Sequence, residues 1–105
     1  MGRGSEMLFL RKQYFAAIRA GSKTTTIRFW RYAMVRPGSE EKVPGLGRLR
    51  IEGVEEISWG ALTAADARAD GFATLRALKA ALAEHYPPPA REGKKLYRVR
   101  FTFLA

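Results

Sequence analysis

The eight residues from Gly21 to Arg28 concentrate the side chains of this chain that could do chemistry. They hold two cations, Lys23 and Arg28, and a row of hydroxyl groups. A threonine hydroxyl becomes a nucleophile when a neighbouring base takes its proton, and a lysine with a lowered pKa can serve as that base. The planar fork of Arg28 could hold a phosphate or carbonyl oxygen. The alternative interpretation is a helix end followed by an ordinary strand whose cations are solvated.

This chemistry requires Lys23 and Thr26 to face the same space. On a straight strand, alternation would put Lys23 on one face and Thr26 with Arg28 on the other. Gly21 can adopt the left-handed conformation that ends a helix, so the chain can turn at that point. We therefore predict a bend at Lys23; a straight strand through Ser22 to Arg28 would remove the site.

Asp70 is the third candidate catalytic residue. It precedes Gly71 at the expected end of a short helix, where a carboxylate opposes the helix dipole at a cost of about 0.3–1 kcal/mol. A residue placed against local electrostatics suggests a functional role. The alternative is a solvated acid or a surface ion pair with Arg68.

Several aromatic and basic residues are candidates for binding. Aromatic side chains stack on nucleic-acid bases, and arginine holds phosphates. The candidates for binding a substrate or RNA are Arg28, Trp30, Arg31, Tyr32, Arg98 and Arg100. Arg98 and Arg100 have an alternative interpretation as the solvated face of the last strand.

The elements that must position these residues follow from hydrophobic periodicity and turn residues. We expect helices over 11–20, 63–70 and 74–85, and strands over 7–10, 24–30, 48–59 and 96–103. A bulge is expected near Gly53, a capping box at Thr63 and Asp66, and a polar loop over 39–47. The predicted fold is α+β, a small curved sheet or barrel with an early helix and two mid-chain helices packed on it. Residues 1–6 are expected to form a tail, and 7–105 a single domain.

The charge balance favours a polyanionic partner. The chain has 105 residues and a formal net charge of +9. Bound cations release counterions from phosphates, so we expect nucleic acid or a nucleotide as the partner. The alternative is that the charge serves solubility alone.

Other classes of protein are disfavoured by composition. With no cysteine and the single histidine His85, we expect no metal site. No apolar stretch reaches the roughly 18 residues of a membrane span, and the start does not resemble a secretory signal. We therefore expect a cytoplasmic protein without membrane contact.

The chain resembles the ASCH domain, a branch of the PUA-like superfamily. Gly21, Lys23, Thr26 and Arg28 match its Gly-x-Lys-x-x-(Glu/Thr)-x-Arg signature. The order of elements extends the resemblance from about residue 7 to residue 103. The resemblance implies a small β-barrel carrying helices, and recognition of RNA or nucleotides.

Many family members carry glutamate where this sequence has Thr26. Threonine there is similar to the small bacterial N4-acetylcytidine amidohydrolases, which implies RNA or a modified nucleoside or nucleotide as the partner. By position, that resemblance implies Lys23 as base, Thr26 as nucleophile and Asp70 as acid/base partner, with no cofactor. The sequence departs from the enzymes' pattern because Asp70 stands where they have the longer glutamate. A non-catalytic RNA-binding module and a ribonuclease are the alternatives.

Overall fold

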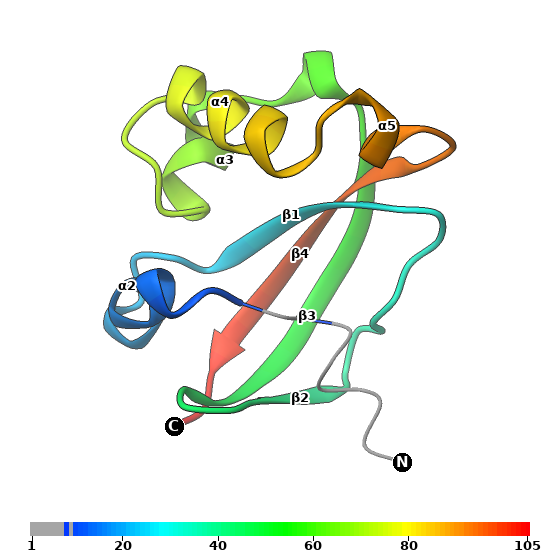
Figure 1. Cartoon of the computed structure of the whole chain (residues 1–105). Helices are drawn as coiled ribbons and strands as arrows, with labels where there is room; N and C mark the ends of the chain where they lie inside the picture. The colour runs from blue at the N-terminus through cyan, green and yellow to red at the C-terminus, as the bar shows by residue number, and fades with distance from the viewer. Residues whose placement is uncertain (1–7, 9) are drawn as a thin grey trace.

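The computed structural model describes Leu8 and residues 10–105, so the predicted tail over 1–6 lies outside the described residues (Figure 1). The helical segments in this part of the chain are η1 (Lys12–Tyr14), α2 (Phe15–Ala20), η2 (Trp59–Ala61), α3 (Ala64–Ala69), α4 (Leu75–His85) and α5 (Pro88–Arg91). The strands are β1 (Thr25–Trp30), β2 (Glu40–Val43), β3 (Gly47–Ile57) and β4 (Lys95–Phe103).

The strands form one antiparallel sheet in the order β1-β4-β3-β2. The sheet curls into a half-barrel, and long β3 carries most of the curvature (Figure 1). The register between β3 and β4 shifts between Ile51 and Gly53. The bulge predicted near Gly53 is therefore confirmed, and it lets both halves of β3 keep an apolar face inward. The predicted α+β class is also confirmed.

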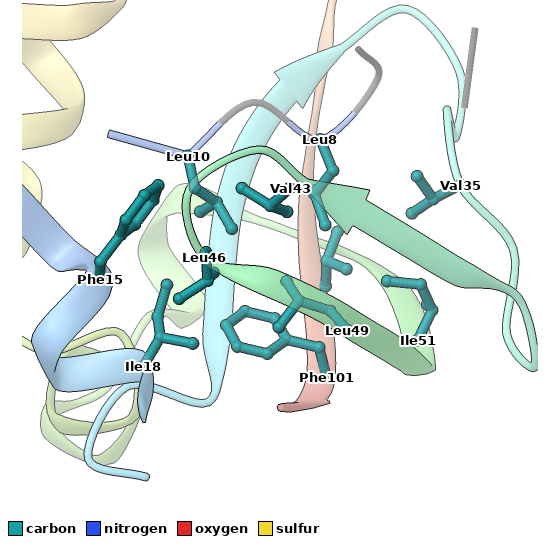
Figure 2. Packing of buried hydrophobic residues seen from close by; sticks show 11 residues of the cluster. Leu8, Leu10, Phe15, Ile18, Val35, Val43, Leu46, Leu49, Ile51 and Phe101 are labelled. Atoms are coloured by element: carbon teal, nitrogen blue, oxygen red, sulfur yellow. The ribbon is translucent and has the colours of Figure 1, made fainter. Parts of the chain in front are cut away.

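Buried side chains form two clusters, one on each side of β1. The first packs α2 and the hairpin of β2 and β3 onto β4, with Phe15 of α2 pointing toward Leu10 and Ile18 pointing toward Phe101 (Figure 2). The second packs α3 and α4 onto the other face. Its members are Ile27, Leu62, Ala67, Leu78, Leu82 and Leu96. Strand β1 is an edge of the sheet and lies between α2 on one side and α3 with α4 on the other (Figure 1).

Threonine side chains cap the first turns of α3 and α4. The Thr63 side chain accepts a hydrogen bond from the Asp66 amide and the Asp66 side chain accepts one from the Thr63 amide, so the predicted capping box is confirmed. Thr74 caps α4 in the same way, through the Ala77 amide. No helix in the described part of the chain is long and apolar enough to cross a membrane.

Two predictions of local structure need correction. The polar loop predicted over 39–47 was wrong, because residues 40–43 form β2 with Glu41 and Val43 buried. Alternation over only four residues, with a charged residue at an inward position, hid this edge strand. The strand predicted over 7–10 partly falls on Met7 and Phe9, which lie outside the described residues. Leu8 and Leu10 belong to no strand and are buried in the first cluster.

Candidate functional site

The bend predicted at Lys23 is present. Helix α2 ends at Gly21 with φ of 81°, and the amides of Ser22 and Lys23 both donate to the carbonyl of Ala17. These bonds hold Lys23 against the helix end, so the strand begins only at Thr25. Alternation along a straight strand therefore does not apply to Lys23, and its side chain turns into the protein.

Lys23 is buried with only 3% of its surface exposed. Its Nζ donates to the Thr25 carbonyl at 2.9 Å and to the Asp70 carbonyl at 2.8 Å. It also lies 3.3 Å from Asp70 Oδ1. The Tyr14 ring centroid is 5.1 Å from Nζ, within cation–π range. The three donors of the ammonium group thus have acceptors, and an aromatic face covers it.

Asp70 reaches Lys23 from the end of α3. The amide of Thr24 donates to the carbonyl of Ala69 at 2.8 Å, which ties the end of this helix to the start of β1. Gly71, with φ of 93°, turns the chain directly over the Lys23 side chain. Asp70 Oδ1 also accepts a hydrogen bond from Thr25 Oγ1 at 3.0 Å. The carboxylate is therefore fixed against the amine by contacts on two sides.

Burial moves the pKa values of Lys23 and Asp70 toward each other. Burial lowers the pKa of Lys23, although the Asp70 carboxylate opposes the shift. Burial raises the pKa of Asp70, although Lys23 and the Thr25 hydroxyl oppose that shift. A lowered amine pKa and a raised carboxyl pKa make proton exchange easier than between free side chains. Such perturbed pairs are frequent at functional sites.

Thr26 and Arg28 approach from β1. Thr26 is 5% exposed, and Arg28 Nε donates to Thr26 Oγ1 at 2.9 Å. The hydroxyl thus acts as an acceptor toward Arg28 and keeps its own proton for donation. Among the described residues, no hydrogen bond joins Lys23 to Thr26 directly.

One cavity of about 220 Å³ brings these residues together. It lies between the segment around η1 on one side and α4 on the other, and residues of β1 also line it. Its charged and polar lining residues are Arg11, Lys23, Thr26, Arg28, Asp70 and His85. Tyr14, Phe72 and Tyr86 supply an aromatic wall, and Leu10 with aliphatic residues of α4 and β1 supplies the rest. Thr25, next to Thr26, lines a different hollow on the opposite face.

The other predicted binding residues lie outside this cavity. Trp30 packs against the first cluster and Tyr97, at 5.9 Å between ring centroids. Arg31 and Tyr32 are exposed beyond the end of β1, Tyr32 at 66%.

Arg98 and Arg100 also lie outside the cavity, and both pair with carboxylates of α3 or β3. Arg98 Nη1 is 2.8 Å from Asp66 Oδ1, and Arg100 Nη2 is 2.7 Å from Glu55 Oε2. Both arginines line the second hollow rather than the cavity with Lys23.

Sequence reasoning missed the aromatic and basic residues at the cavity's rim. Neither Tyr14, within the helix expected over 11–20, nor Phe72 was assigned a role. Their rings meet edge-on at 6.3 Å between centroids. Arg11 and His85 are also joined, with Arg11 Nη2 3.2 Å from His85 Nδ1. No local signal could have found these pairs, because each joins segments more than fifty residues apart.

No family model matches the sequence, and no curated protein matches it. Solved structures do match its fold. An ASCH domain from Lactobacillus crispatus superposes with a TM-score of 0.66 at 16% identity, covering 90% of this chain and 75% of that one. The chain has the fold of an ASCH domain. This ASCH fold is shared with the hypothetical protein PH0355, at a TM-score of 0.71 and 13% identity over 90% of this chain and 94% of that one. Protein EF3133 from Enterococcus faecalis also matches this fold, with a TM-score of 0.65 at 18% identity. The match covers 99% of this chain and 76% of that one.

Proposed function

We propose that the protein is an ASCH-family amidohydrolase that removes the acyl group from an N4-acylated cytidine. The observation that carries the proposal is that Lys23, Thr26 and Arg28 line one cavity with Asp70. These residues occupy the motif positions of the family, and the fold agrees with that resemblance. In this proposal, Thr26 is the nucleophile, Lys23 the base and Asp70 its proton partner.

The reaction proceeds by acyl transfer to Thr26. Lys23 in its neutral form takes the hydroxyl proton while Thr26 Oγ1 bonds to the acyl carbon. The negative charge that develops on the carbonyl oxygen is stabilised by the Arg28 guanidinium. The bond from the acyl carbon to N4 breaks, and cytidine leaves with the proton returned by the Lys23–Asp70 pair. Water then attacks the acyl-Thr26 ester, releasing the carboxylate and restoring the hydroxyl.

The lowered pKa of Lys23 supports this role, because a base must spend time without its proton at working pH. Asp70 can relay the proton, since its raised pKa allows it to hold one. Thr26 is a better candidate for the nucleophile than Thr25, because only Thr26 lines the cavity. The Thr25 hydroxyl donates a hydrogen bond to Asp70 instead.

The cavity's size favours a small substrate over a polymer. A volume of about 220 Å³ lies below the usual range of roughly 300–1,000 Å³ for drug-sized ligands. A pyrimidine ring with a short acyl group is a ligand of this class. Its aromatic ring matches the wall of Tyr14, Phe72 and Tyr86.

The test is hydrolysis of N4-acetylcytidine by the purified protein. We expect release of acetate and cytidine, and loss of that release in Lys23→Met and Thr26→Val. Thr24→Val is the matched control, because Thr24 is exposed and lies outside the cavity. Retention of full activity in Lys23→Met or Thr26→Val would refute the mechanism.

The second candidate function is RNA binding without catalysis. The net charge of +9 and the exposed Arg31 and Tyr32 beyond β1 favour it. It predicts binding of single-stranded RNA that weakens steeply with salt and with Arg31→Gln. Binding unaffected by salt would refute it. Intact RNA in the same reactions would also exclude the ribonuclease alternative.

A further inference from the structure

A pair of side chains at the rim of the cavity presents positive charge and hydrogen-bond donors. Arg11 immediately precedes η1, and His85 is the last residue of α4. Both are exposed and both line the cavity. Arginine can only donate, so the contact of 3.2 Å from Arg11 Nη2 makes His85 Nδ1 the acceptor. The neutral ring then carries its proton on Nε2, which remains a donor.

The lining of the cavity has more cations than anions. Its cations are Arg11, Lys23 and Arg28, and Asp70 is the one carboxylate among its described lining residues. Asp70 already faces Lys23 at 3.3 Å. The guanidinium groups of Arg11 and Arg28 thus share a cavity whose described lining holds no acid besides Asp70.

The two guanidinium groups also act on each other. Burial is the main cause that lowers the pKa of Arg28; Tyr86 and Asp70 oppose the shift, and the positive charge of Arg11 adds to it. Two like charges on one cavity repel, so an anion bound near them relieves an unfavourable interaction. The aromatic wall beside them suits a ligand that is both anionic and aromatic.

We infer that the cavity binds a phosphorylated nucleoside, with the base against the aromatic wall and a phosphate monoester at Arg11 and His85. This inference rests on the proposed function and narrows its substrate to an N4-acylated cytidine monophosphate. The fork of Arg11 supplies two parallel donors to phosphate oxygens, and His85 Nε2 supplies another. The Arg11–His85 contact holds these donors together at the rim.

The experiment compares N4-acetylcytidine with its 5′-monophosphate. We expect kcat/KM for the nucleotide to exceed that for the nucleoside by about 10- to 100-fold, the range of a hydrogen-bonded charge contact. Arg11→Gln and His85→Leu should each reduce this preference. Arg76→Gln is the matched control, because Arg76 is an exposed arginine of α4 outside the cavity lining. Equal efficiency on the two substrates, or a preference that survives Arg11→Gln, would overturn the inference.

A binding measurement separates failure of the inference from failure of the proposed function. Isothermal titration should show cytidine 5′-monophosphate binding at least about 10-fold more tightly than cytidine, with the difference reduced in Arg11→Gln. If neither acylated substrate is hydrolysed, the amidohydrolase proposal fails, and the titration alone decides the phosphate site. Equal affinity for cytidine and its monophosphate overturns the inference, whatever the activity.

Discussion

Replacing Asp70 by asparagine should destabilise the protein in a way that depends strongly on pH. The substitution keeps the size of the side chain and removes the charge that faces Lys23 at 3.3 Å. The side chains of the pair are 3% and 7% exposed, so solvent does little to screen the loss. Lys23 keeps its two carbonyl acceptors but must either stay charged without a counter-charge or give up its proton.

The structure sets the size of the effect. At 3.3 Å and an effective dielectric constant of about 20, the lost attraction is about 5 kcal/mol. Giving up the proton of Lys23 at pH 7 costs about 4.6 kcal/mol, because lysine in the unfolded chain titrates near 10.4. Lys23 takes whichever of these two responses costs less, and that cost sets an upper limit on the loss of stability. We therefore expect Asp70→Asn to cost about 3–5 kcal/mol at pH 7, the usual range for a broken buried pair.

The penalty should shrink as pH rises. In the variant, the pKa of Lys23 in the folded protein lies further below its unfolded value, so the unfolded chain binds more protons between the two pKa values. Stability therefore rises with pH in that window, up to the unfolded pKa near 10.4. At pH 9, removing the proton of Lys23 costs about 2 kcal/mol, so the stability penalty of Asp70→Asn cannot exceed about that value.

Urea unfolding at pH 7 and pH 9 measures this for wild type, Asp70→Asn, Lys23→Met and the double variant. The double variant should lose less than the sum of the single variants by about 1–3 kcal/mol. Glu40→Gln is the control, since it breaks an exposed ion pair with Arg48 and should cost at most about 1 kcal/mol. A penalty for Asp70→Asn that is the same at both pH values, together with additive single variants, would refute the coupled pair.

Two further predictions concern the support of the site. Thr25→Val removes the hydroxyl that donates to Asp70, so the pKa of Asp70 rises further and the acidic limb of the pH profile of kcat/KM moves to higher pH. Thr24→Val should leave that limb in place, and an equal shift in both variants would contradict the assignment. Gly21→Ala meets no atom within 4 Å, so its cost is the left-handed backbone alone, about 1–2 kcal/mol in urea unfolding. An unchanged stability would show that the helix does not end as described.

The parts of the site that could be predicted from sequence depend on short-range chemistry. Gly21 predicts the helix end, and the bend at Lys23 follows from it within two residues. Thr63 and Asp66 predict the start of α3, which in turn places Asp70 at its end. The approach of Asp70 to Lys23 joins residues 47 positions apart, so it followed only from the resemblance and not from any local pattern.

The parts that could not be predicted depend on which residues meet across the fold. The basic face expected for Arg98 and Arg100 is neutralised by Glu55 and Asp66, and the register after the Gly53 bulge places Glu55 opposite Arg98. An offset of one residue in that register would have changed which side chains face the arginines. The aromatic wall could not be predicted from the sequence either, because Tyr14 comes from the first helical segment and its partner Phe72 from the middle of the chain.

In the proposed mechanism, Thr26 carries the acyl group during the reaction. The most direct measurement is rapid mixing with N4-acetylcytidine, acid quenching and mass spectrometry of the peptide that contains residues 23–28. We expect a transient acetyl group on Thr26 that is absent in Thr26→Val and that forms slowly in Lys23→Met. Release of cytidine with no acetylated peptide, or with the acetyl group on Thr25, would contradict it.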